Sequence, residues 1–180
     1  MATETTEYTL EDVKRDAGKE QHKAELSERM QLIIFKLGTE EYGLSIEQIK
    51  EVVLTPRIAK MPQTAAHIKG VANIRGNIIA IMDLEMKFGL TQSTAQENPD
   101  NANYTLVMES DEYKVGILVK EVPNTLSIQL SDIDTASNFI QYTSLDTDSV
   151  IGVVKSGERM IILIDMIKLI TAENLNANLS

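Results

Sequence analysis

The chain has 180 residues, 43% of them hydrophobic and 4% aromatic, and its formal net charge is −10. Phosphate binding requires Lys and Arg and base stacking requires aromatic rings, so the composition argues against a nucleic-acid partner, and the charge argues against an acidic partner surface. The absence of cysteine excludes disulfides, thiolate zinc sites and a cysteine nucleophile. The chain starts without a signal-peptide pattern, and no apolar stretch approaches the roughly 18 to 20 residues of a membrane span, so we expect a cytoplasmic protein.

The first 30 residues are rich in charge and poor in large apolar side chains. Thr9, followed by Glu11 and Asp12, has the pattern of a helix start, because a hydroxyl can cap the first turn and early acids suit the helix dipole. Gly18 weakens the middle of such a helix. Two alternatives stay open for this tail, a frayed helix outside the folded domain and a disordered segment.

Residues 32–37 form a short apolar run, 38–41 a polar turn, and 42–46 a segment that alternates with period two, which together predict a β-hairpin. The apolar residues that come next, Ile46, Ile49 and Val52, recur at helical spacing and predict a single turn or a short helix that ends before Pro56.

A second hairpin is predicted over residues 67–82, with its turn at Arg75 and Gly76. Its second strand is apolar at every position, which is typical of a strand buried on both faces. Residues 84–90 predict one or two helical turns, and the polar stretch 91–103 predicts a linker.

The second half of the chain repeats this order. Strands are predicted at 104–108 and 113–119, and a weaker one at 126–128. Residues 131–149 are polar and predict a solvated loop. Residues 150–171 predict a last hairpin followed by a short helix.

The two halves share a motif. A Gly-Val pair leads through a turn to an apolar run and an Asp that lies thirteen positions after the glycine, from Gly70 to Asp83 and from Gly152 to Asp165. The turns are matched as Arg75-Gly76 with Ser156-Gly157, and the upstream segment 41–44 is echoed by 112–115.

This repeat predicts a mainly β protein made of two similar small barrels in tandem, with a groove between them. Units of roughly 60 to 70 residues have marginal cores, so we expect a shared interface. The predicted boundaries are a tail at 1–30, a first unit at about 31–90, the linker at 91–103, a second unit at about 104–172, and a C-terminal tail at 173–180.

Catalytic signatures are absent from the sequence, including GxSxG, a Gly-rich phosphate loop, HExxH and CxxC. Asp83 and Asp165 each follow an apolar strand and precede a helical segment, where Asp commonly caps the helix. The alternative is a carboxylate pair in an enzyme, with Glu51 as a further acid or base. His67 is read as a strand or turn residue, because one His cannot build a metal site. We expect no enzyme activity, cofactor or metal.

Arg75 is the residue that the fold explains least, because a small polar residue would serve in this turn. It has two compatible interpretations, an ion pair with Glu51 and a planar donor presented at a groove to a partner's carboxylate or carbonyl groups. Two interpretations also apply to the apolar residues Ile46, Ile49 and Val52. They either cap the first barrel as core residues or form an apolar surface patch for a protein partner.

The segment 68–84, with the core Gly-Val-Ala-Asn-Ile-Arg-Gly at 70–76, strongly resembles the CheW family of bacterial chemotaxis coupling proteins. Tyr42-Gly43-Leu44 with the later Glu51-Val52, and the Leu-Ile-Asp at 163–165, occur in the order that this family shows. The resemblance covers about residues 32–172. The chain departs from it in its longer tail and in Ala65 and Ala80, which stand where the family often has proline.

The resemblance implies two five-stranded, SH3-like barrels with short helices. It implies a non-enzymatic adaptor that couples the cytoplasmic tips of chemoreceptors to the regulatory domain of a CheA histidine kinase, at membrane-associated arrays. The positions that match the receptor groove are Ile49, Glu51, Gly70, Asn73 and Arg75. The positions that match the kinase-binding surface are Ile46, Ile49 and Val52. A scaffold of a related pathway in motility or biofilm control, with a different receptor and kinase, is the alternative.

Overall fold

The computed structural model describes residues 28–90, 104–135 and 147–177. The predicted linker at 91–103 and nearly all of the predicted N-terminal tail lie outside these ranges. The described elements, in chain order, are β1 (Arg29–Leu37), β2 (Glu40–Ser45), η1 (Ile46–Gln48), β3 (Glu51–Leu54), β4 (Ile68–Ile74), β5 (Asn77–Met82), α2 (Leu84–Lys87), β6 (Tyr104–Glu109), β7 (Lys114–Val119), β8 (Asn124–Gln129), η2 (Leu130–Asp132), β9 (Ile133–Asp134), η4 (Thr147–Ser149), β10 (Val150–Ser156), β11 (Arg159–Ile164) and α3 (Met166–Ala177).

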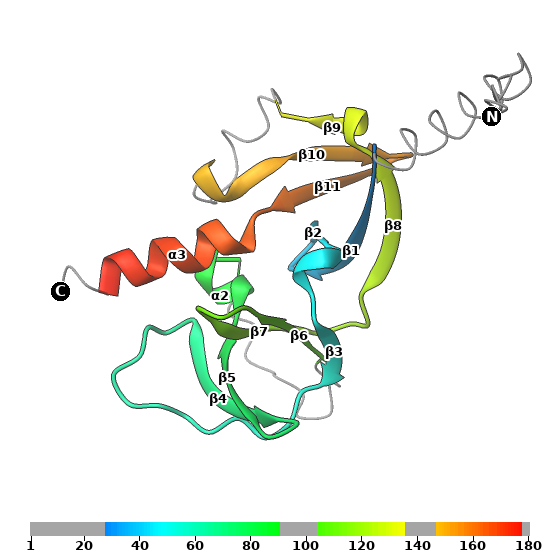
Figure 1. Cartoon of the computed structure of the whole chain (residues 1–180). Helices are drawn as coiled ribbons and strands as arrows, with labels where there is room; N and C mark the ends of the chain where they lie inside the picture. Colours follow the sequence, from blue (N-terminus) through cyan, green and yellow to red (C-terminus); the bar gives the residue numbers. More distant parts are fainter. Residues whose placement is uncertain (1–27, 91–103, 136–146, 178–180) are drawn as a thin grey trace, which may run out of the picture.

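These strands form two sheets, which confirms a mainly β fold of two SH3-like barrels with short helices (Figure 1). One sheet has six strands in the order β8-β1-β2-β11-β10-β9, and the other has five in the order β3-β6-β7-β5-β4. We call them barrel 1 and barrel 2. Barrel 2 closes where the chain after β3 returns to β4 through a bridge between Ala59 and Val71.

The tandem arrangement and its unit boundaries are wrong, because each barrel takes strands from both halves of the chain. Barrel 1 combines β1 and β2 with β8 to β11, whereas barrel 2 combines β3 to β5 with β6 and β7. Four strand pairings join the halves: β2 with β11 and β5 with β7 are parallel, whereas β1 with β8 and β3 with β6 are antiparallel. The chain has therefore exchanged its first hairpins between the two repeats.

The repeat itself is present in the structure. The hairpins β4–β5 and β10–β11 each shift register at their glycine, Gly70 or Gly152, where another segment passes close to the backbone. The upstream match was misaligned by two residues: Gly43 lies opposite Leu163 in barrel 1, and its counterpart Gly116 lies opposite Ile81 in barrel 2.

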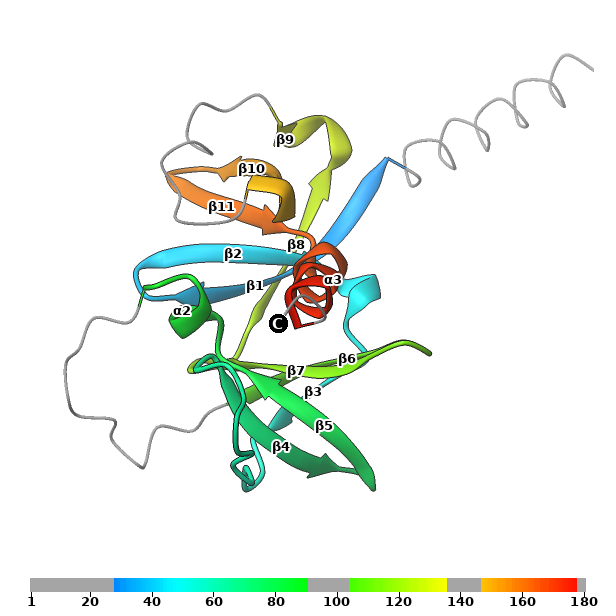
Figure 2. The ribbon, with the colours of Figure 1, turned by 90° about the vertical axis from the view of Figure 1, so that its left-hand side faces the viewer.

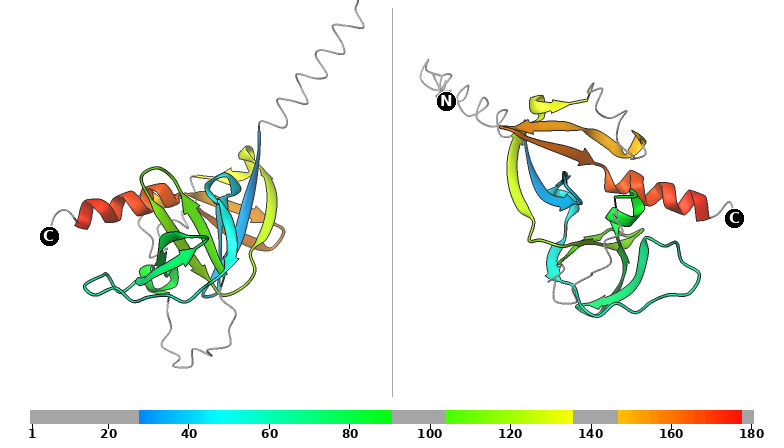
Figure 3. Two further views of the ribbon diagram at one scale, coloured as in Figure 1. Left: turned by 60° about the horizontal axis from the view of Figure 1, so that its bottom comes forward. Right: turned by 180° about the vertical axis from the view of Figure 1, so that it is seen from behind.

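The largest apolar core lies between the two barrels. Eighteen buried residues from both sheets and both α-helices form it, whereas the barrel interiors contribute clusters of six and five. Seen from the side and from behind, α3 leaves β11 in the space between the sheets, and its buried residues Met166, Leu169 and Ile170 belong to this shared core (Figures 2 and 3). Because burial of apolar surface drives folding, the barrels stabilise each other.

Three local predictions are corrected. Of the single turn or short helix predicted from Ile46, the structure has a single 3-10 turn, η1, and the residues at Val52 and Val53 belong to strand β3 instead of continuing it. The predicted loop at 131–149 includes β9, which pairs with β10. The described strands and helices also reach beyond the predicted folded range at both ends: β1 begins at Arg29, inside the predicted tail, and α3 continues to Ala177, beyond the predicted end at 172.

Candidate partner-binding site

Arg75 occupies a left-handed backbone conformation at the turn between β4 and β5. Its φ is +52° and that of Gly76 is +85°, a pair of positive values typical of a tight type I′ hairpin turn. Asn73 supports the turn, because its Oδ1 accepts a hydrogen bond of 2.9 Å from the backbone N–H of Gly76. A residue with a Cβ is strained at such a φ by roughly 1 to 2 kcal/mol.

The second repeat uses glycine at the same place. Ile74 faces Asn77 across the first turn and Ser156 faces Arg159 across the second, so Arg75 corresponds to Gly157, whose φ is +64°. The predicted match of Arg75 with Ser156 was one residue out of register. Since glycine adopts this conformation without strain, the fold alone does not call for arginine.

The ion pair expected between Arg75 and Glu51 is confirmed. Arg75 Nε lies 2.7 Å from Glu51 Oε2, which joins the turn after β4 to the first residue of β3. These strands are the two edges of the five-stranded sheet, so the pair helps to close barrel 2. The Arg75 side chain is 75% exposed, and a guanidinium has five N–H donors, so this contact leaves donors for a partner.

Gly70 is a buried residue of β4, the strand that leads into the turn at Arg75. Its φ is +139°, and a Cβ at this position would overlap the carbonyl oxygen of Ala59. Ala59 and Val71 exchange backbone hydrogen bonds of 2.8 and 2.9 Å at this point. Gly70 therefore shapes the strand that carries Asn73 and Arg75, whose side chains are exposed.

The predicted apolar patch is divided between core and surface. Ile46 and Ile49 are half-buried and pack against the shared core, which confirms the core interpretation for two of the three residues. Val52 is 40% exposed, and Leu54, two positions further along β3, is 65% exposed. Their cross-strand neighbours Leu106 and Tyr104 belong to or pack against the shared core, so the two side chains extend that apolar face to the surface.

Leu54, the last residue of β3, and a charged cluster near the start of β3 were not among the predicted site residues. Val52 was grouped with Ile46 and Ile49 at helical spacing, so the strand alternation that places Val52 and Leu54 on one face was not recognised. In the charged cluster, Lys50 and Lys114 flank Glu109, and Lys114 Nζ also donates to Asn77 Oδ1 at 3.1 Å. The hydrogen bond from Lys50, with a further one from Lys114, holds the pKa of Glu109 below its usual value. Glu109 and Lys114 face each other in the β6–β7 hairpin, but Lys50 and Asn77 come from distant segments, so the cluster as a whole was not predicted.

The candidate acids act as helix caps. Asp83 Oδ1 accepts from the backbone N–H of Met86 at 3.1 Å, and Asp165 Oδ1 accepts from Ile167 at 3.0 Å and Lys168 at 3.2 Å. Glu51 is engaged with Arg75. Within residues 28–90, 104–135 and 147–177, no group of three or more His, Asp or Glu side chains could hold a metal ion.

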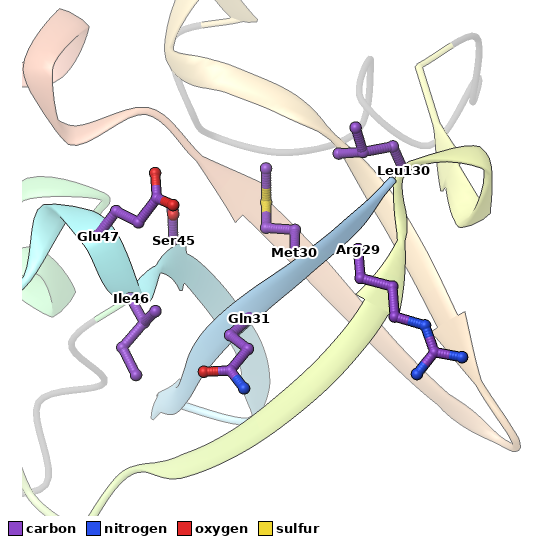
Figure 4. Close-up of a pocket in the computed structure, with 7 residues that line it drawn as sticks. All are labelled: Arg29, Met30, Gln31, Ser45, Ile46, Glu47 and Leu130. Atoms are coloured by element: carbon purple, nitrogen blue, oxygen red, sulfur yellow. The ribbon is translucent and has the colours of Figure 1, made fainter. Parts of the chain in front are cut away.

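Two hollows of about 370 and 300 Å³ lie beside the start of β1 and share Met30, Ser45 and Glu47 in their linings. Figure 4 shows the hollow of about 370 Å³, in which the side chains of Arg29 and Glu47 lie at opposite ends and do not approach each other. The second is lined mainly by apolar side chains of barrel 1. Neither offers the paired acid and base that general acid–base chemistry requires.

The described helices include none long and apolar enough to cross a bilayer. Two barrels packed on a shared core, with an exposed arginine in a strained turn and an apolar edge strand beside it, define a protein-binding module.

Comparison with known proteins gives this module a family. The model of the CheW-like domain matches residues 31–174, so the chain belongs to the CheW-like domain family. It is 34% identical to the chemotaxis protein CheW of Klebsiella aerogenes over 81% of this chain and 84% of that protein, and 28% identical to CheW of Treponema pallidum over 82% and 86%. The crystal structure of the scaffolding protein TtCheW from Thermoanaerobacter tengcongensis superposes with a TM-score of 0.64 at 31% identity, over 76% of this chain and 84% of that one.

Proposed function

We propose that this protein is a non-enzymatic adaptor that couples chemoreceptors to a CheA-type histidine kinase in a chemotaxis array. Membership of a family whose relatives are chemotaxis proteins and whose solved neighbour is a scaffolding protein supports this role. The observation that carries it is Arg75: an exposed arginine is kept in a strained conformation at a turn where the second repeat has glycine. Strain retained without a structural need is typical of functional sites.

The receptor surface lies at the β4–β5 turn of barrel 2. Arg75 and Asn73 are its exposed members, Glu51 orients the guanidinium, and Gly70 allows the close strand packing beneath them. Ile49 lies on the core side of this surface, because it is half-buried and packs against the shared core. A fork of N–H donors suits carboxylates or the free carbonyl groups of a receptor's helical tip.

The kinase surface lies along η1 and β3, where the chain passes from barrel 1 to barrel 2. Val52 contacts the kinase's regulatory domain directly, together with Leu54, while Ile46 and Ile49 support η1 from the core side. Apolar side chains that extend a buried face to the surface form the kind of desolvated centre that protein interfaces use.

Isothermal titration calorimetry of the full chain tests these surfaces. The ligands are a receptor-tip fragment and the regulatory domain of a CheA kinase from the same organism. Arg75→Glu removes charge-assisted hydrogen bonds worth about 1.5 to 3 kcal/mol, so receptor affinity falls by roughly 10- to 150-fold while kinase affinity is kept. Leu54→Asp weakens only the kinase titration.

Normal receptor binding by Arg75→Glu contradicts the receptor surface, and normal kinase binding by Leu54→Asp contradicts the kinase surface. If the unaltered protein binds neither ligand, the adaptor role in chemotaxis is wrong. Binding to the receptor and kinase of a different sensory pathway would then support the related-scaffold alternative.

A further inference from the structure

One carboxylate, that of Glu85 on α2, contacts both barrels. Its Oε1 accepts a hydrogen bond of 3.0 Å from the backbone N–H of Gly38, in the β1–β2 turn of barrel 1. Its Oε2 accepts one of 2.7 Å from Lys120 Nζ, which directly follows β7 of barrel 2. Figure 2 shows α2 between the β1–β2 turn and β7. The Glu85 side chain is 13% exposed, and partial burial strengthens charged hydrogen bonds relative to fully solvated ones.

The position of Glu85 is fixed by its neighbours. Asp83 caps α2, and Leu84 is fully buried in the shared core. The backbone carbonyl of Glu85 accepts a 2.8 Å hydrogen bond from Leu90 N–H, and Leu90 lies 3.8 Å from the place where a Gly38 side chain would begin. The β1–β2 turn, α2 and the end of β7 therefore form one packed contact.

The repeat shows that the fold does not require a carboxylate here. Asp83 and Leu84 correspond to Asp165 and Met166, which cap α3 and enter the core in the same way. The residue that corresponds to Glu85 is Ile167, an apolar side chain that is 48% exposed. The start of α2 therefore does not depend on Glu85. Its two contacts, with Gly38 of barrel 1 and Lys120 of barrel 2, add a polar link between the barrels on one side of the molecule, which we call the tie.

The tie lies at one end of β2, and the proposed kinase surface lies at the other. β2 runs from Glu40, beside the tied turn, to Ser45, which leads directly into η1. Six strand residues span about 20 Å, so a small tilt of this hairpin against barrel 2 displaces η1 relative to Arg75.

We propose that Glu85 is a positioning residue that sets the orientation of the β1–β2 hairpin on barrel 2 and thereby the coupling between receptor binding and kinase binding. This inference rests on the proposed adaptor function. Coupling between two sites must act equally in both directions, and it is measured as the ratio of kinase affinities with and without the receptor fragment.

The test compares the full chain with Glu85→Ala, Glu85→Gln and the matched control Ile167→Ala. Hydrogen exchange at the Gly38 amide reports the tie. It accelerates about 10-fold or more in Glu85→Ala, which lacks the acceptor, and stays within about threefold in Glu85→Gln and Ile167→Ala. Circular dichroism and urea unfolding verify that each variant is folded.

Calorimetry of the same variants reports the coupling. The unaltered protein couples the two ligands by about 5- to 150-fold, Ile167→Ala retains this factor, and Glu85→Ala lowers it to within about twofold of unity while each separate affinity changes less than about threefold. If the Gly38 amide exchanges at the same rate in Glu85→Ala as in the unaltered protein, the hydrogen bond from Gly38 to Glu85 does not hold the turn and the proposal is wrong. Faster exchange with unchanged coupling overturns the positioning role alone. Absence of any binding by the unaltered protein overturns the adaptor function and the coupling role with it, and hydrogen exchange still decides whether the tie exists.

Discussion

Replacing Arg75 by glycine separates the structural from the functional value of this residue. The substitution removes the Arg75–Glu51 ion pair, and because the arginine is 75% exposed, such a pair contributes about 0 to 1 kcal/mol. It also relieves the left-handed strain at φ +52°, which amounts to roughly 1 to 2 kcal/mol. The added chain entropy of glycine in the unfolded state offsets about 0.4 to 1 kcal/mol of that gain.

The three contributions largely cancel, so the free energy of unfolding of Arg75→Gly lies between a loss of about 1 kcal/mol and a gain of about 1.6 kcal/mol. At this chain length that corresponds to a shift in Tm of less than about 6 °C. The matched substitution in the other repeat, Gly157→Ala, introduces the same strain at φ +64° without a compensating contact. The loss of glycine's chain entropy in the unfolded state offsets part of this strain, so the protein is destabilised by about 1 kcal/mol.

Urea unfolding followed by circular dichroism measures both variants, and receptor titration completes the comparison. We expect Arg75→Gly to keep its stability and lose receptor affinity, and Gly157→Ala to lose stability and keep its affinity. A loss of more than about 2 kcal/mol in Arg75→Gly would show that barrel closure explains the arginine, and the argument from strain to function would then fail.

Three further predictions concern the fold. Gly70→Ala forces a Cβ into the carbonyl of Ala59 and destabilises the protein by about 3 kcal/mol in urea unfolding; a loss below about 1 kcal/mol contradicts the close approach. The hydrogen bonds from Arg159 lower the pKa of Glu41 below 4.5, so its contribution to stability is present above pH 4.5 and is lost as pH falls through the folded-state pKa. The stability difference between the unaltered protein and Glu41→Gln should therefore shrink between about pH 7 and pH 3, and a constant difference refutes the assignment. Cleavage at an inserted protease site within 91–103 should leave both halves in one folded particle on size-exclusion chromatography, and a half that unfolds cooperatively by itself contradicts the exchanged hairpins.

Much of the candidate site was recognisable from sequence because the motif 70–76 is local. The residues that make its turn are adjacent in the chain, and Arg75 was notable as an arginine where a small residue suffices. Its φ, and the register that matches it with Gly157, required the backbone. The Glu51 contact was predicted, whereas the contacts of Lys50 with Glu109, of Lys114 with Asn77 and of Glu85 with Gly38 and Lys120 join residues 35 or more positions apart, and no local signal indicates them.

The single turn at Ile46 was predicted, whereas the assignment of Val52 to the same helical spacing was wrong for a physical reason. A spacing of three residues between Ile46 and Ile49 fits a 3-10 turn, which has three residues per turn, as well as it fits a helix. Val52 then continues the same spacing by coincidence, because it belongs to a strand that pairs with β6. Leu54 was overlooked for the same reason.

The sequence by itself determined the hairpins, their glycine positions and the Asp caps, because each depends on backbone preferences and apolar patterns within about fifteen residues. Only the tertiary structure decided which hairpin joins which barrel. A strand that is apolar on both faces, such as β5 or β11, can be buried against either repeat, and the pattern of alternation does not specify its neighbour. The observed exchange places eighteen buried residues between the barrels, and this shared core exists only once both halves have folded together.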